Sequence, residues 1–250
     1  MRIKADNRYE LKYVLDQAQC QPLLNTLATY LECDTNGDGE GRYSVTSLYY
    51  DSPDYRAYWD KLEGHRFRRK VRVRVYGNQQ VTPQTACFLE IKQRLNKTLR
   101  KKRVMLPYAA ATALCEAGEA VEQALSSQET AMVDEVHYLQ QILHLQPACV
   151  VSYDRLAFEG SEQDPGLRIT FDTYLKGRIY DLSLLSQGAV ESYFILPPQW
   201  CVMEIKVNYR VPYWLTELIG RYRCTLRRIS KYCTALEQGK VVRRRGQIIY

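Results

Sequence analysis

The sequence has few histidines and no closely spaced cysteines, and both shortages exclude classes of protein. None of its eight cysteines forms a CxxC pair; they lie at positions 20, 33, 87, 115, 149, 201, 224 and 233. We therefore expect free buried thiols and no zinc ribbon. The three histidines, His65, His137 and His144, lie outside the strand-like segments described below. The sequence thus offers no Ser/His/Asp constellation for nucleophilic catalysis.

Long apolar segments are also missing. The N-terminus, MRIKADNRYELKY, is charged and has no apolar signal-peptide core. No run of about 18 apolar residues occurs, so we expect no membrane span. Together with the unpaired cysteines, these features predict a cytoplasmic protein.

The charge balance favours polyanionic partners. The chain has 250 residues with 35 basic and 28 acidic side chains, a net charge of +7. This excess suits nucleic acid, phosphates or acidic lipid without choosing among them. We do not expect nucleic acid, because no binding motif for it is present and the arginines alternate along strands instead of clustering with aromatic residues.

Four segments alternate between apolar and polar residues, the period of a strand with two unlike faces, and the first of them does so strictly. They are VRVRVY at 71–76, FLEIK at 88–92, RITFD at 168–172 and MEIKV at 203–207. We predict further strands at 8–14, 43–50, 104–106, 149–158 and, more weakly, 179–182. Helices are predicted from Asp16 to about Leu31, from Ser52-Pro53 to Gly64, within 107–146, and at 213–220 and 230–238. The loop 34–42 begins like a calcium loop but has Val45 at the twelfth position, so we predict a plain surface loop.

The polar faces of these strands contain mainly cations, with Arg more frequent than Lys. The cations are Lys12, Arg72, Arg74, Lys92, Arg155, Arg168 and Lys206. Such faces either meet water on an open sheet or line a closed barrel, which about eight strands suffice to close. Arginine donates bidentately to phosphate or carboxylate oxygens, and a lumen that receives a polyanion avoids the cost of burying unpaired cations.

At this point the chain resembles a known family over nearly its whole length. It is similar to the vacuolar transporter chaperone (VTC) domain, the polyphosphate polymerase branch of the CYTH-like triphosphate tunnel metalloenzymes. The matching segments are RYELKY at 8–13, SLYYDSPDY at 47–55, KLEG at 61–64, VRVR at 71–74, FLEIK at 88–92, YDRLAF at 153–158, LRITFD at 167–172, MEIK at 203–206 and SKY at 230–232.

The resemblance implies a single domain over residues 1–250, of α+β class. Its centre would be a closed antiparallel β-barrel tunnel with helices packed on the outside, and the tunnel would bind ATP and polyphosphate. The catalytic residues implied are Arg72, Arg74, Lys92, Arg155, Arg168 and Glu204. The substrate-binding residues implied are Lys12, Tyr153, Lys206, Ser230, Lys231 and one of Lys101 and Lys102. Glu204 would also be the ligand of Mn²⁺ or Mg²⁺.

Three activities stay open within this resemblance: a polyphosphate polymerase that transfers the γ-phosphate of ATP, an inorganic triphosphatase, and a non-catalytic sensor of polyphosphate or nucleotide. Tunnel hydrolases typically open with Glu-x-Glu-x-Lys, whereas this chain has Arg8 in the first position. The loss of that carboxylate favours polymerisation or binding over hydrolysis. Eukaryotic members also have a regulatory domain and membrane helices that this sequence does not show, so coupling to membrane translocation would need a partner protein.

Overall fold

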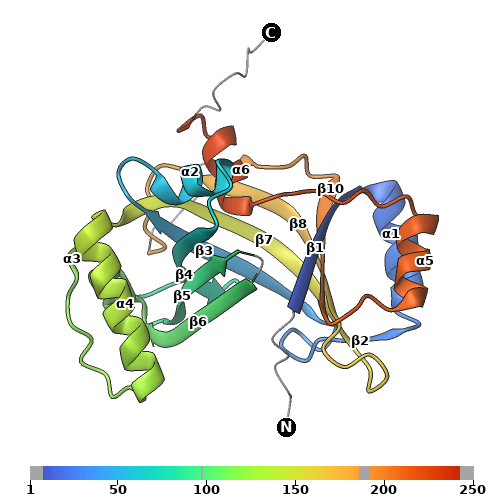
Figure 1. Ribbon diagram of the computed structural model, residues 1–250, viewed down its shortest axis with the longest axis horizontal. Coiled ribbons are helices and arrows are strands. Elements are labelled where there is room, and N and C mark those ends of the chain that lie inside the picture. Colours follow the sequence, from blue (N-terminus) through green and yellow to red (C-terminus); the bar gives the residue numbers. More distant parts are fainter. Residues whose placement is uncertain (1–7, 97, 186–191, 243–250) are drawn as a thin grey trace. The chain divides into compact units, whose positions relative to one another are not determined.

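The computed structural model describes residues 8–96, 98–185 and 192–242, which form ten strands and six helices (Figure 1). The pairs β1–β10, β10–β8, β2–β7, β3–β4, β4–β5 and β5–β6 are antiparallel. The chain divides into two compact units. Unit 1 comprises Met1–Ser44, Tyr153–Lys176 and Phe194–Ser230, and unit 2 comprises Val45–Ser152, Gly177–Tyr193 and Lys231–Tyr250. That residues 1–250 make a single domain stays a prediction.

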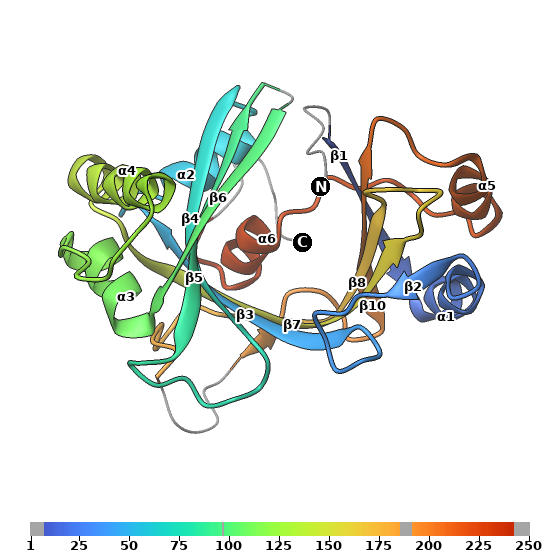
Figure 2. The ribbon, with the colours of Figure 1, turned by 90° about the horizontal axis from the view of Figure 1, so that it is seen from below.

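Unit 1 is a sheet covered by two helices on its apolar face. Its strand order is β1-β10-β8-β7, with β2 paired to β7 and β9 paired to β8. The elements are β1 (Arg8–Asp16), α1 (Gln17–Leu27), β2 (Leu31–Cys33), the end of β7 (Gln146–Gly160), β8 (Arg168–Arg178), β9 (Tyr193–Phe194), β10 (Trp200–Asn208) and α5 (Tyr213–Arg221). Helices α1 and α5 lie side by side (Figures 1 and 2). Leu23 of α1 and Leu215 of α5 pack with Phe171 in one buried cluster.

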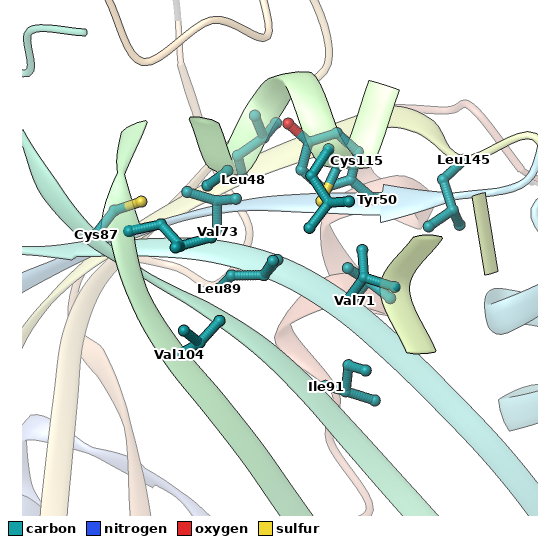
Figure 3. Close-up of a cluster of buried hydrophobic side chains, with 14 of the residues drawn as sticks. Leu48, Tyr50, Val71, Val73, Cys87, Leu89, Ile91, Val104, Cys115 and Leu145 are labelled. Atoms are coloured by element: carbon teal, nitrogen blue, oxygen red, sulfur yellow. The ribbon is translucent and has the colours of Figure 1, made fainter. Parts of the chain in front are cut away.

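Unit 2 has the same organisation, with strand order β3-β4-β5-β6. Its elements are β3 (Arg42–Asp51), α2 (Arg56–Leu62), β4 (Phe67–Tyr76), β5 (Ala86–Leu95), β6 (Thr98–Pro107), α3 (Tyr108–Ala117), α4 (Ser127–Leu143) and α6 (Lys231–Gln238). Helices α3 and α4 lie against one face of β4–β6 (Figure 2). Figure 3 shows how Val71 and Val73 of β4 meet Leu89 and Ile91 of β5 in this core. The alternating valines therefore face the helices, and Arg72 and Arg74 face the opposite side.

The α+β class, the large antiparallel sheet and the helices packed on its apolar side are confirmed. The closed barrel of about eight strands is not: the strand order ends at β1 in unit 1 and at β6 in unit 2, and the described strands number ten. The sequence could not decide this point, because alternation gives one polar face whether or not a sheet closes.

Two helices begin or end where the sequence did not predict. Asp16 caps α1 in a capping box with Gln19, as expected, but α1 ends at Leu27. Leu31, the predicted helix end, is buried; it is the first residue of β2 and pairs with Gly160 of β7. Helix α2 begins at Arg56, after the predicted start at Ser52. The N-cap is Tyr55, whose side chain makes no capping hydrogen bond, and the Ser52 hydroxyl accepts the Arg56 N–H at 3.0 Å.

The segment 179–182 was predicted as a strand, and this is wrong. Asp181 has a φ of 45°, which breaks the extended conformation, and the nearby strand is β9. The helical region 107–146 is confirmed as two helices, since Gly118 (φ 69°) ends α3 in the left-handed conformation. All eight cysteines are free, as predicted, but only five of them are buried: Cys33 is exposed, and Cys20 and Cys224 are half-buried. No helix in the described part of the chain combines the length and apolar composition that crossing a membrane requires.

Candidate functional site

The charged residues of unit 1 form two rows across three strands. Strand register places Lys12 of β1 opposite Glu204 of β10, and Glu204 opposite Thr170 of β8. The next row, two residues along each strand, contains Glu10, Lys206 and Arg168. Alternate residues of a strand share a face, so both rows lie on the face opposite the apolar core of this unit. We call these two rows the Glu204 face.

Glu204 is 5% exposed and contacts two lysines at the centre of this face. The Lys12 Nζ lies 3.0 Å from Glu204 and 2.7 Å from Glu10, and the Lys206 Nζ lies 2.5 Å from Glu204. Burial alone would lower the pKa of Lys12, but Glu204 and Glu10 outweigh it and raise that pKa. For Lys206 burial prevails: burial and the positive charge of Arg155 lower its pKa by more than Glu204 and Glu10 raise it. Two ammonium groups thus share one buried carboxylate.

Arg155 of β7 makes a bidentate ion pair next to this face. Its Nε and one terminal nitrogen donate to the two carboxylate oxygens of Asp172 at 2.6 and 2.9 Å, and the same terminal nitrogen donates to the Tyr153 hydroxyl at 3.3 Å. Burial alone would lower the pKa of Arg155, yet Tyr153 and Asp172 raise it well above its usual value. The planar guanidinium of Arg155 therefore already binds a carboxylate, and it does so in the geometry that arginine also uses to bind phosphate.

Arg168 lies at the edge of the same face and pairs with Asp34. The Arg168 Nε donates to Asp34 at 3.1 Å, and a terminal nitrogen contacts both Asp34 and the Tyr43 hydroxyl. Asp34 is 1% exposed, so the prediction of a plain surface loop over 34–42 is wrong at its first residue. Burial would raise the pKa of Asp34, but hydrogen bonds from Arg168 and Asn36 lower it.

Unit 2 has its own charged face, which we call the Glu90 face, on the side of the sheet opposite its core. Glu90 of β5 is fully buried and accepts from Arg72 of β4 at 2.8 and 2.5 Å and from Lys101 of β6 at 3.1 Å. Arg72 also donates to the Tyr49 hydroxyl at 3.0 Å. Burial would raise the pKa of Glu90, but Arg72, Arg74 and Lys101 lower it to about 2. One carboxylate therefore organises the cations of three strands.

The remaining predicted residues of unit 2 separate into two groups. Arg74 and Lys92 lie on the Glu90 face. Arg74 is 6% exposed, and its Nε donates to the Ser47 hydroxyl at 3.0 Å. Lys92 lies opposite Lys101 in the register of β5 and β6. Lys102 lies on the opposite face, where its Nζ meets Glu135 of α4 at 2.6 Å. Of the two lysines that the sequence left open, the structure thus brings Lys101 to the charged face and not Lys102.

Ser230 and Lys231 lie at the start of α6. This helix is anchored by its second residue, Tyr232, whose hydroxyl donates to the buried Asp51. The Lys70 Nζ lies 4.7 Å from the centre of the Tyr232 ring. Lys70 is on the same side of β4 as Arg72, so the anchor places the start of α6 near the Glu90 face.

Sequence reasoning missed Thr170. Its hydroxyl is buried, the residue is 1% exposed, and the oxygen has no hydrogen-bond partner among the described residues. Buried polar atoms are rarely left unsatisfied without a missing water, ion or ligand. The alternation in RITFD does place Thr170 on the charged face, between Arg168 and Asp172. Threonine is common in strands, however, so its presence there does not by itself indicate a functional residue.

The described residues contain no group of three His, Cys, Asp or Glu side chains arranged to hold a metal. Glu204 and the unsatisfied Thr170 hydroxyl nevertheless lie opposite each other on neighbouring strands. Hard cations such as Mg²⁺ take oxygen ligands and usually keep several waters together with one or two carboxylates and substrate phosphates. Glu204 and Thr170 fit a cation of this kind, which takes only some of its ligands from the protein. Glu204 is the carboxylate that would hold it.

Several solved structures are similar to the chain. A putative adenylate cyclase from Bacillus halodurans has a TM-score of 0.50 at 11% identity, covering 91% of this chain and 96% of that one. A Pyrococcus horikoshii OT3 protein (TM-score 0.47, 14% identity, 93% and 99% coverage) and a putative adenylate cyclase from Vibrio parahaemolyticus (0.42, 11%, 91% and 96%) are also similar. At these identities the likeness concerns the fold alone, and only the first of the three scores is high enough to support it.

No curated protein matches the chain. The family model described as the VTC domain matches residues 7–239. That match includes every strand of both charged faces and the start of α6. The chain therefore belongs to the VTC domain family.

Proposed function

We propose that this protein is a metal-dependent polyphosphate polymerase that transfers the γ-phosphate of ATP to a growing polyphosphate chain. Membership of the VTC family supports a protein that handles triphosphate or polyphosphate. The observation that carries the proposal is the Glu204 face, where Lys12, Lys206 and an unsatisfied Thr170 hydroxyl surround one buried carboxylate. Lys12 and Lys206 can exchange their ion pairs with Glu204 for contacts with phosphate oxygens, and Glu204 can then bind a cation.

The residues present suit phosphoryl transfer, which needs positioning and neutralisation of charge more than covalent chemistry by the protein. The terminal oxygen of the acceptor chain would bond to the γ-phosphorus of ATP. The bond from that phosphorus to the bridging oxygen would break, and ADP would leave with the electron pair. Lys12, Lys206 and the fork of Arg155 would bind the phosphates on the Glu204 face, and Arg72, Arg74, Lys92 and Lys101 would do so on the Glu90 face.

A bound Mn²⁺ or Mg²⁺ would supply neutralisation of charge on the phosphate oxygens. Glu204 would hold it, and Lys12 and Lys206 would remain beside it as phosphate ligands. Ser230 and Lys231 are proposed to bind phosphate groups at the start of α6. A cytoplasmic location and a membrane partner protein remain part of the proposal.

The proposal is tested by incubating the pure protein with ATP, Mn²⁺ and a short polyphosphate primer and resolving the products on a gel. A ladder of lengthening chains with release of ADP is expected. Orthophosphate without a ladder would overturn the polymerase in favour of a triphosphatase. Tight triphosphate binding in calorimetry without any turnover would leave a sensor.

Thr170→Val should separate ligand binding from stability. Valine has the shape of threonine without the hydroxyl, so removal of an unsatisfied buried polar atom is expected to leave the melting temperature unchanged or slightly higher. Affinity for tripolyphosphate is expected to fall about tenfold, the loss of one hydrogen bond to a charged group of about 1.5 kcal/mol.

Calorimetry and thermal unfolding of the Thr170→Val variant measure both quantities. The matched control is Thr173→Val, on the same strand, whose hydroxyl reaches the Asp154 carbonyl on the other side of the sheet. Equal tripolyphosphate affinities in the two variants would show that Thr170 does not contact the ligand.

A further inference from the structure

Like charges face each other at one end of the Glu90 face. The register of β4 and β5 pairs Arg72 with Glu90, an opposite-charge pair, but two residues further along it pairs Lys70 with Lys92, and after that Arg68 with Arg94. These residues alternate along their strands, so they share one face. Opposed like charges destabilise a sheet, and the chain has two such pairs in succession.

The outer pair has no carboxylate to neutralise it. Among the described residues, no acid forms an ion pair with Lys61 of α2, Arg68 or Arg94. The Arg94 Nε donates to the Asn96 carbonyl at 2.8 Å. The nearby Asp60 is engaged by the His65 ring at 3.1 Å. Glu90, which neutralises Arg72 and Lys101, lies four residues away from Arg94 along β5.

The three cations repel one another. Burial lowers the pKa of Lys61, and the charges of Arg68 and Arg94 lower it further. Burial and the charge of Arg94 likewise lower the pKa of Arg68, with Asp60 offsetting only part of the effect. Cations that are held together against their mutual repulsion are suited to bind an anion, because the bound negative charge removes that repulsion.

We propose that Lys61, Arg68 and Arg94 form a second phosphate-binding site in unit 2, separate from the Glu90 network. Two guanidinium forks and one ammonium group match the several oxygens of a phosphate, to which arginine donates bidentately. Measured along β4, Arg68 lies four residues from Arg72, or about 13 Å at the rise of a strand. The phosphate is either a free ion, such as inorganic phosphate or pyrophosphate, or a distant part of a polyphosphate chain. The site does not depend on the proposed polymerase activity.

The double variant Arg68→Gln/Arg94→Gln tests this site. Without ligand, its melting temperature is expected to equal or exceed that of the natural protein, because a like-charge pair is removed. Its affinity for a phosphate ligand is expected to fall at least tenfold. The control is Arg100→Gln/Arg210→Gln, which removes the same charge from exposed arginines, one of them on the opposite face of β6.

Calorimetry with pyrophosphate and with long-chain polyphosphate distinguishes the two sources of the phosphate. Loss of affinity for both ligands supports a site for free phosphate ions, and loss for the long chain alone supports a site for the distant part of a chain. Affinities equal to those of the control for both ligands would overturn the proposal. Since binding is measured without ATP turnover, failure of the polymerase assay would leave this result unaffected.

Discussion

Glu204→Gln is expected to lose at least about 100-fold of its ATP turnover, since a cation at a phosphoryl centre contributes several kcal/mol to the transition state. The fold should survive, because glutamine has the size of glutamate and Lys12 keeps its contact with Glu10 at 2.7 Å. Binding of Mn²⁺ in the presence of a non-hydrolysable triphosphate should weaken in parallel. The measurements are turnover, calorimetric Mn²⁺ affinity and melting temperature.

The control for this variant is Glu32→Gln, which changes an exposed glutamate on a strand of the same unit and should alter none of the three quantities. A Glu204→Gln protein that retains full turnover would remove Glu204 from the proposed chemistry. If the natural protein shows no turnover and Glu204→Gln keeps its triphosphate affinity, the sensor hypothesis gains support instead.

Arg72→Gln is expected to lower the free energy of unfolding by about 3 kcal/mol, the lower end of the range for breaking a buried ion pair. Glu90 is fully buried and would lose the two hydrogen bonds that Arg72 donates to its Oε2, although Lys101 still contacts it. Urea unfolding measures the loss. Arg221→Gln breaks an ion pair whose two side chains are 60% and 55% exposed, so it should cost less than about 1 kcal/mol. Equal effects of the two substitutions would show that the Glu90 network is not stabilising.

The same network predicts how stability depends on pH. The pKa of Glu90 is about 2 in the folded protein, below its ordinary value of 4.5. A lowered pKa stabilises the fold where the carboxylate is ionised in both states, so the contribution is complete above about pH 5 and disappears as the pH falls towards about 2. It amounts to about 3 kcal/mol. In Glu90→Gln the slope of unfolding free energy against pH over this interval should be shallower than in the natural protein. An unchanged slope would assign the acid sensitivity to other carboxylates.

The charged faces were predictable because alternation is a local property. In VRVRVY, a strand places every second residue on the same side, so once the valines are buried, the arginines must face away from the core. The same argument placed Glu204 with Lys206 and Arg168 with Asp172. It could not give the partners, because strand order and register bring together residues far apart in sequence, such as Asp34 and Arg168.

The carboxylates illustrate this limit. The sequence drew attention to the cations and treated their neighbours as part of a mixed polar face. The structure shows that Asp34, Glu90 and Asp172 are among its most buried acids and that each pairs with an arginine. A pairing between strands depends on which strands are adjacent, and no single segment contains that information.

The sequence by itself determined the α+β class, the helix-covered apolar faces and the set of cations on the opposite faces, because these follow from periodicities of two and 3.6 residues. Only the tertiary structure decided that Lys101 and not Lys102 reaches the charged face, that the Thr170 hydroxyl is buried without a partner in the described part of the chain, and that Arg68 faces Arg94. Each of these depends on register or burial, which arise from packing between distant segments and not from the order of residues within one segment.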